Sequence, residues 1–279
     1  MARIVSLWRS GELSLHRFDH PAEHEDRPYE SIASAFAASF VDDGTFDLHV
    51  DADRWRLAQG DVFLRHPGMR FRASFDGAGF SDTCLTLTYL AADDDRFDAA
   101  RSWARAGRSV LRASNRLRYL RWALRRAIEE RAPMLIEYCA AEVFREHDAS
   151  RAALFREHKF AWYAERVHAV RERLEAQLDH AHTVSELARS VGMSTFHFTR
   201  VFSELVGEPP HRYLGEVRLR AAQSMLQAGR SVTETCFACG FNSLSHFHNR
   251  FTRRYGVAPS RVNERKFARN RKQQPCSSV

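Results

Sequence analysis

The feature that most constrains the fold of this chain is an internal repeat in its last hundred residues. The segment that starts at Thr183 (Thr-Val-Ser-Glu) recurs 48 residues later from Ser231 as Ser-Val-Thr-Glu. Beyond the glycines Gly192 and Gly240 the offset becomes 49, and the two copies then match at Phe198 and Phe247, Phe202 and Phe251, Gly207 and Gly256, Pro210 and Pro259. Because self-similarity at a fixed period marks a repeated supersecondary unit, we expect two similar units, with one extra residue in the second.

Each copy predicts two short helices. A hydroxyl residue followed three positions later by Glu is the pattern of a capping box, which starts a helix. A glycine then breaks each copy, and a new helix restarts at Ser194 or Ser243. Apolar residues lie at helical spacing on both sides of the glycines: Val184, Leu187, Ala188, Val191 and Phe198, Val201, Phe202, Leu205 in the first copy; Val232, Cys236, Cys239 and Phe247, Phe251, Tyr255 in the second. Two short helices joined in this way predict a helix-turn-helix unit.

A third helix is expected between the two units. The pair Pro209-Pro210 stops the preceding helix, and a broadly apolar helical pattern follows from about residue 211 to 228. Such a helix would lie between the units and fix their separation. That separation matters because two helices that enter successive grooves on one DNA face must lie one turn apart, ~34 Å.

Positive charge is concentrated in the same region. The chain of 279 residues has a formal net charge of +7. Residues 181–279 contain 15 Lys and Arg against 6 Asp and Glu, whereas residues 1–180 contain 27 against 29. A basic module on a neutral or acidic one indicates a polyanionic partner. The alternative is a solvated basic tail, since residues 261–272 supply six of the positive charges.

Residues 165–265 resemble the AraC/XylS family of bacterial transcription regulators. The matching positions are Val184 to Ala188, Gly192 to Phe202, Gly207, Pro210, Tyr213, Leu214, Arg218, Leu219, Ala222, Cys239 to Phe241, Phe247, Phe251, Tyr255, Gly256 and Pro259. The resemblance implies that double-stranded DNA is the partner. It also implies that the helix beginning at Ser194 enters one major groove and the helix beginning at Ser243 enters the next.

The resemblance indicates which side chains would face DNA. These are Thr195, Phe196, Thr199 and Arg200 on the first helix, and Leu244, Ser245, His248 and Asn249 on the second. Arg200 is the best candidate for a base contact, because a guanidinium can bond to both O6 and N7 of guanine. The alternative is that Arg200 contacts only phosphate.

The second helix departs from the commonest family pattern at two positions. Asn249 stands where Arg is usual, so this helix could contact adenine or serve mainly as a clamp on the DNA backbone. Arg250 stands where a small apolar residue is usual, and its direction is left open.

The N-terminal residues 1–97 predict a different architecture. Short β-rich runs, separated by turn residues, indicate an antiparallel sandwich or barrel; they span 32–40, 45–50, 55–57, 62–64, 71–75 and 83–90. Residues 55–68 resemble the cupin-like sensor domain common in this family, which implies a small-molecule effector. Arg70 follows the Pro-Gly turn where many cupins have a metal-binding histidine, so no metal is expected. Arg70 would favour an anionic effector; a surface Arg on a structural barrel is the alternative.

The predicted fold class is therefore multidomain α+β. A cupin-like β-barrel sensor domain (1–97) precedes a helical connector (98–160) expected to dimerise. An all-α double helix-turn-helix domain of AraC type (161–268) and a flexible basic tail (269–279) follow.

An enzyme is the main rival class of function. The pair Cys236 and Cys239 has the spacing of a redox or zinc site, but it falls on the first helix of the second unit, where both sulfurs would point into the core. No second Cys pair of this spacing, HExxH or Walker-type loop is present. Neither catalysis nor a cofactor is expected.

Location and further partners follow from weaker signals. The five scattered cysteines do not resemble a disulfide framework, and no signal-peptide or membrane-spanning pattern is present, so a cytoplasmic protein without membrane contact is predicted. A second copy of the chain, RNA polymerase and a small-molecule effector are candidate partners of an activator. A constitutive DNA-binding protein, whose N-terminal half only dimerises, is the third class of hypothesis.

Overall fold

The computed structural model describes residues 3–20, 29–74, 82–90, 109–145 and 153–262. The predicted basic tail, 269–279, and Cys276 lie outside these residues. The chain divides into two compact units, Met1–Phe160 and Ala161–Val279. Within the described residues, no helix is both long and apolar enough to cross a membrane.

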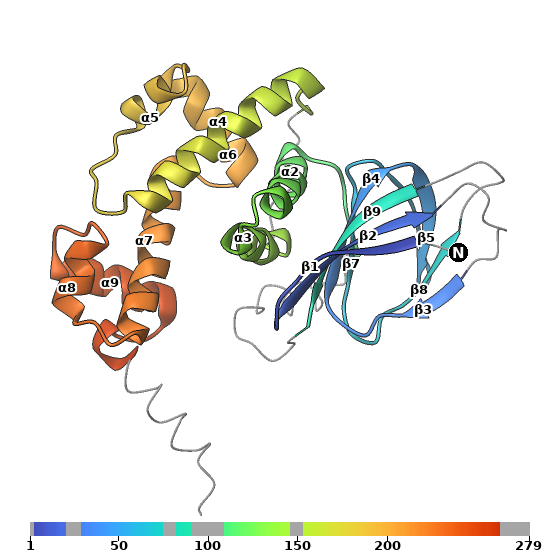
Figure 1. Ribbon diagram of the computed structural model, residues 1–279, viewed down its shortest axis with the longest axis horizontal. Helices are drawn as coiled ribbons and strands as arrows, with labels where there is room; N and C mark the ends of the chain where they lie inside the picture. Colours follow the sequence, from blue (N-terminus) through green and yellow to red (C-terminus); the bar gives the residue numbers. More distant parts are fainter. Residues whose placement is uncertain (1–2, 21–28, 75–81, 91–108, 146–152, 263–279) are drawn as a thin grey trace, which may run out of the picture. The chain divides into compact units, whose positions relative to one another are not determined.

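The N-terminal unit contains two antiparallel sheets (Figure 1). One sheet has six strands, in the spatial order β1 (Arg3–Arg9), β2 (Leu13–His20), β9 (Asp82–Tyr89), β4 (Ala37–Asp43), β7 (Val62–Arg65) and β10 (Val110–Leu111). The other has four, in the order β3 (Tyr29–Ile32), β8 (Arg70–Ser74), β5 (Thr45–Val50) and β6 (Asp53–Ala58). The strand pairs among the described residues form two separate sheets, so the expected closed barrel is not observed.

Alternating side chains explain why these strands form. In β8, Arg70 and Arg72 are exposed whereas Phe71 and Ala73 are buried, as expected of a strand with one face on the core. The hairpin of β5 and β6 turns at Asp51, which adopts a positive φ of 51°. Asp tolerates this left-handed conformation better than most residues, so it suits a tight turn.

The sequence located most of these strands but missed three. Strands β5 to β9 fall within a residue or two of the predicted runs, and the run 32–40 corresponds to the end of β3 and most of β4. No prediction covered β1 and β2. The connector was expected to be helical, yet its described residues include strand β10, whose residues Val110 and Leu111 pair with β7. A two-residue strand has no periodicity of its own and exists only through its partner.

Among its described residues, the N-terminal unit also contains the helices α2 (Asn115–Glu129) and α3 (Pro133–Val143). The buried Tyr89 hydroxyl at the end of β9 donates a hydrogen bond of 2.5 Å to the carbonyl of Ala140 on α3. The carboxylate of Asp42 accepts from Arg121 and Arg125 on α2, at 3.2 and 2.6 Å. Polar contacts at buried strand ends therefore fix both helices on the six-stranded sheet (Figure 1).

The regular elements of the C-terminal unit are all helices within its described residues, which end at 262. Helix α4 (Glu157–Ala176) crosses the boundary between the units. It is followed by α5 (Val184–Ser190), α6 (Thr195–Val206), α7 (Pro210–Gln227), α8 (Val232–Ala238), α9 (Leu244–Tyr255) and the short 3-10 helix η2 (Pro259–Arg261). Within this unit α7 runs between the pair α5 and α6 and the pair α8 and α9 (Figure 1).

Candidate nucleic-acid interface

The first helix-turn-helix unit is delimited by local hydrogen bonds that the sequence specifies. Thr183 and Glu186 form a complete capping box at the start of α5, and these bonds lower the pKa of the Glu186 carboxyl. The Ser194 hydroxyl accepts from the amide of His197 at 3.3 Å and so starts α6. Helix α6 ends at Gly207, whose φ of 88° lies in the left-handed region that favours glycine.

The second unit repeats this arrangement with one difference. The hydroxyls of Ser231 and Ser243 accept from amides three residues later and start α8 and α9. Gly256 ends α9 with a φ of 69°. Among the described residues, however, the Glu234 side chain does not return a bond to Ser231, so the second predicted capping box is only half formed.

The inner faces of both units are buried as the periodicity predicts. In the first unit Phe198, Val201, Phe202 and Leu205 are almost fully buried, and the Phe202 ring packs edge-on against Tyr213 of α7. The core of the second unit joins α7 to α8 and α9 through Leu219, Ala222, Leu226, Cys236, Cys239, Phe241, Phe247 and Phe251.

Cys236 and Cys239 are core residues, as predicted. Both are fully buried; the sulfur of Cys236 lies 3.8 Å from the carbonyl oxygen of Phe241, and that of Cys239 lies 3.7 Å from the sulfur of Met225. Burial raises the pKa of both thiols, for Cys239 to about 11. Both sulfurs therefore stay protonated near neutral pH, which makes them poor nucleophiles and metal ligands.

Helix α7 is tied to α4 and to the segment that follows it. The buried guanidinium of Arg171 donates to the Tyr213 hydroxyl at 2.8 Å and to Glu175 at 3.1 Å, and the Tyr213 hydroxyl donates to Glu175. Arg218 donates to the carbonyls of Leu178 and His180, at 2.8 and 2.9 Å. These bonds fix α7 relative to the helix that precedes the first unit.

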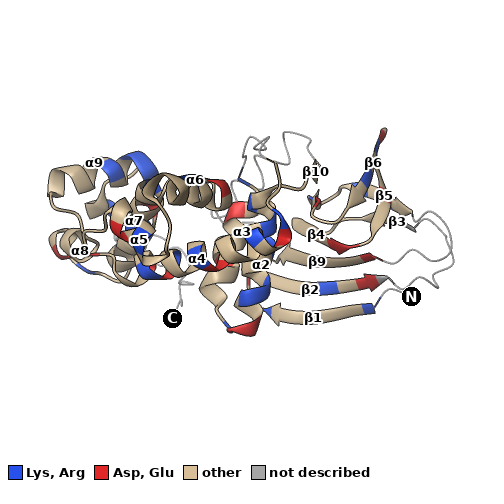
Figure 2. Cartoon of the chain, turned by 90° about the horizontal axis from the view of Figure 1, so that it is seen from above, with Lys and Arg blue, Asp and Glu red and all other residues tan. Residues whose placement is uncertain are grey.

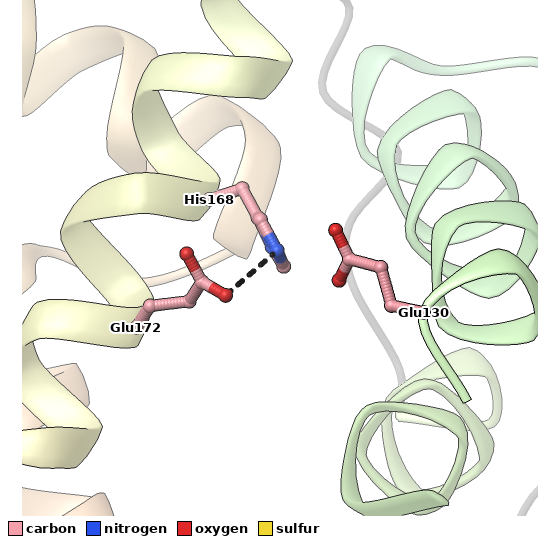
Figure 3. Close-up of side chains that lie close together, drawn as sticks. All are labelled: Glu130, His168 and Glu172. Atoms are coloured by element: carbon pink, nitrogen blue, oxygen red, sulfur yellow. Dashed lines mark ion pairs between the residues drawn. The ribbon is translucent and has the colours of Figure 1, made fainter. Parts of the chain in front are cut away.

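A further ion pair lies along α4. Nε2 of His168 is 3.5 Å from a carboxylate oxygen of Glu172, one helical turn later (Figure 3). On the same helix, Arg166 lies over the Trp162 ring, 3.6 Å from its centroid, and donates to the carbonyl of Val191. The Tyr163 hydroxyl lies 3.1 Å from His197 in the first turn of α6. The contacts of Arg166 with Val191 and of Tyr163 with His197 were not foreseen, because residues so far apart in sequence give no local signal.

The outward face of α6 carries the four side chains singled out in the sequence. Thr195, Phe196 and Arg200 are exposed, and Thr199 is partly exposed, with its hydroxyl bonded to the Thr195 carbonyl at 2.8 Å. Phe196 is 80% exposed, which is unusual for so large an apolar side chain and indicates that packing does not explain its position. Arg200 makes no ion pair or hydrogen bond with the residues that the structure describes.

The matching face of α9 is also open. Leu244, Ser245, His248 and Asn249 are all exposed, while Phe247 and Phe251 behind them are fully buried. The last turn adds Arg253 and Arg254 (Figure 2). Arg250 points elsewhere, against Gly215 of α7.

The structure places Arg70, the candidate for an anionic effector, on the exposed face of β8. A different arginine lies beside the buried aromatic side chains. The guanidinium carbon of Arg65 is 5.4 Å from the centroid of Phe63 and 5.7 Å from that of Phe71, and Arg65 donates to the Ser39 hydroxyl at 2.7 Å. Sequence reasoning missed Arg65, although its spacing of two residues from Phe63 on β7 places both side chains on one face.

Two helix-turn-helix units joined by one helix define the class of this C-terminal unit as a double helix-turn-helix domain. Residues 187–265 match the family model described as a helix-turn-helix domain. The chain is 41% identical over 80 residues to an HTH-type transcriptional regulator of Mycobacterium tuberculosis, a match that covers 28% of this chain and 31% of that protein. It is 32% identical over 87 residues to the HTH-type transcriptional regulator ArgR of Pseudomonas aeruginosa, over 31% and 26% of the two chains.

Two solved structures are also similar in part to this chain. A transcriptional regulator of the AraC type from Chromobacterium violaceum is 25% identical, with a TM-score of 0.36, over 38% of this chain and 96% of that one. The DNA-binding domain of AdpA, in complex with a target DNA, is 30% identical, with a TM-score of 0.36, over 39% and 98%. The two sequence relatives above are matched over less than a third of their own length. The sequence matches thus show that residues 187–265 are similar to the helix-turn-helix domains of bacterial transcription regulators.

Proposed function

We propose that this protein is a sequence-specific DNA-binding transcription regulator that inserts α6 and α9 into successive major grooves. One observation carries the proposal: each helix buries one face in its own unit and leaves the opposite face open. On each open face, polar side chains accompany one large apolar side chain, Phe196 on α6 and Leu244 on α9. This combination suits the major groove, where base edges offer hydrogen-bonding groups and thymine offers a methyl group.

Within this proposal Arg200 contacts a base. Its exposed guanidinium forms no ion pair or hydrogen bond with the described residues, so it is available to the O6 and N7 acceptors of guanine. On α9, Asn249 would contact adenine, and the exposed Arg253 in the basic last turn would contact phosphate.

We also propose that the two sheets of the N-terminal unit form a cupin-like sensor for a small-molecule effector. The support is a set of three polar side chains, of which Arg65 lies beside buried aromatic rings. Arg65 donates to the Ser39 hydroxyl, and the Ser39 hydroxyl lies 2.8 Å from the Thr86 hydroxyl. An effector with an anionic or strongly accepting group would suit Arg65. Arg70, on the outer face of β8, remains a weaker candidate. Dimerisation through the connector and activation through RNA polymerase complete the proposal.

Selection of bound sequences from random duplexes, followed by footprinting, tests the DNA-binding proposal with the full chain. The expected result is one enriched motif with two protected patches centred 10–10.5 base pairs apart, the spacing of successive grooves on one DNA face. Failure to enrich any motif at low salt would refute it. Repeating the selection with and without a library of small carboxylates separates a sensor from a constitutive DNA-binding protein.

A further inference from the structure

One contact between the second unit and the joining helix is unusually close. A Cβ atom placed on Gly215 of α7 would lie only 2.4 Å from Nη2 of Arg250, 2.8 Å from Nη1 and 2.9 Å from Cζ. The guanidinium therefore fills the space that any larger residue at position 215 would need. Arg250 is partly buried, and within the described part of the chain it forms no hydrogen bond or ion pair.

The position of Arg250 on α9 explains its direction. Its neighbour Phe251 is fully buried in the core, whereas His248 and Asn249 lie on the open face. Arg250 thus lies at the edge of the buried face, next to α7. One turn later on the same edge, Arg254 forms an ion pair of 2.8 Å with Glu216, which follows Gly215. Two contacts in a row connect α9 to one short stretch of α7.

We propose that Arg250 is a positioning residue that sets the distance and angle of α9 on α7 by packing over Gly215. It does not itself contact DNA. The effect on DNA recognition rests on the proposed function, whereas the packing can be tested on the protein alone.

The physical reason is that the separation of two packed helices depends on the side chains at their contact. Arginine can cover apolar surface with its stem while its charged end stays partly in water, and here a glycine provides the space for it. Because the two groove-facing helices must match a separation of ~34 Å, a small tilt of α9 on α7 would displace Asn249 from its base. A residue that controls this tilt thereby controls recognition of the second half-site.

The first test uses variants of Arg250 in the full chain, with the DNA site selected above. We expect Arg250→Ala to weaken binding roughly tenfold, within the range of couplings between residues in contact, and to weaken protection of the second half-site only. The salt dependence of binding should stay as in the wild type, because no phosphate contact is lost. Arg250→Met keeps the length of the side chain but removes its charge. Because substitutions that keep side-chain volume disturb packing little, this variant should bind DNA within about twofold of wild type.

Arg253→Ala is the matched phosphate-contact control, since it removes from the same helix one exposed positive charge that the proposed function places against phosphate; it should weaken binding and lower the magnitude of the salt slope by about 0.9. If Arg250 instead contacts phosphate, the Arg250→Ala and Arg250→Met variants will be equally weak, and the slope of log K against log salt will fall in magnitude by about 0.9. That result would overturn the proposal, as would weakening spread evenly over both half-sites.

The second test combines Arg250 with Gly215. Gly215→Ala should displace the guanidinium and weaken binding to the second half-site. In Gly215→Ala/Arg250→Ala the obstructing group is gone, so we expect binding no weaker than in Arg250→Ala alone. If the residues act independently, the two losses will multiply, which would refute the packing role.

The same four proteins, compared by thermal unfolding without DNA, should show a similarly non-additive pattern. This measurement tests the packing even if no DNA sequence is bound. Additive shifts in Tm would overturn the proposed contact, whereas a failed DNA selection with non-additive shifts would refute only the proposed function.

Discussion

Replacing Tyr213 by Phe should show how strongly α7 depends on its polar contact with α4. The substitution removes only the hydroxyl, because the ring stays in contact with Phe202. The lost group accepts a 2.8 Å hydrogen bond from Arg171, a guanidinium that is only 2% exposed. It also donates to Glu175, which remains bonded to Arg171.

The expected cost follows from these contacts. A hydrogen bond to a charged group contributes about 1.5–3 kcal/mol. Since Arg171 keeps Glu175, its charge is not left uncompensated, and the larger cost of breaking a buried ion pair does not apply. We therefore expect Tyr213→Phe to lower the free energy of unfolding of the C-terminal unit by about 1.5–3 kcal/mol.

Urea unfolding followed by circular dichroism would measure this change. Tyr163→Phe is the matched control, because it removes a hydroxyl whose bond to His197 is exposed, and we expect a cost below about 0.5 kcal/mol there. A cost below about 0.5 kcal/mol for Tyr213→Phe as well would refute the view that this contact holds α7 in place.

Three further outcomes are expected. Arg200→Ala should weaken binding to the selected site by ~1–3 kcal/mol and relax the preference for one base pair; equal weakening on all sequences would show that Arg200 contacts only phosphate. Affinity for DNA should fall steeply as salt is raised, because the C-terminal third carries a large excess of Lys and Arg; a flat response in a filter-binding titration would contradict a DNA-bound role. Cys236 and Cys239 should resist alkylation in the folded protein at pH 8 and react after unfolding in urea, since both are buried and the pKa of Cys239 is raised to about 11; labelling of the native protein at the rate of the unfolded one, followed by mass spectrometry, would argue against the core assignment.

The C-terminal unit was largely predictable from sequence because its boundaries are set by contacts between near neighbours. Ser194 and Ser243 start α6 and α9 by bonding to amides three residues away. Gly207 and Gly256 end these helices through their own backbone conformation. Since such signals depend on only a few consecutive residues, the open faces of α6 and α9 could be assigned before the structure was known.

In the N-terminal unit, strands β1 and β2 could not be predicted from local sequence signals. Strands β1 and β2 mix charged with apolar residues and lack clean alternation. They exist because β2 pairs along its whole length with β9, roughly seventy residues later, and β1 pairs with β2. Strand pairing over such separations is specified by the assembled sheet, and no short window of sequence contains it.

The sequence by itself therefore determined the repeat, the helix ends and the residues that face outward on α6 and α9. Only the tertiary structure decided that Arg65 rather than Arg70 lies beside the buried aromatic rings, and that Arg250 packs on Gly215. The reason is physical: periodicity tells which face of a helix or strand is buried, but the partner of a long, flexible arginine side chain depends on which element folds against it.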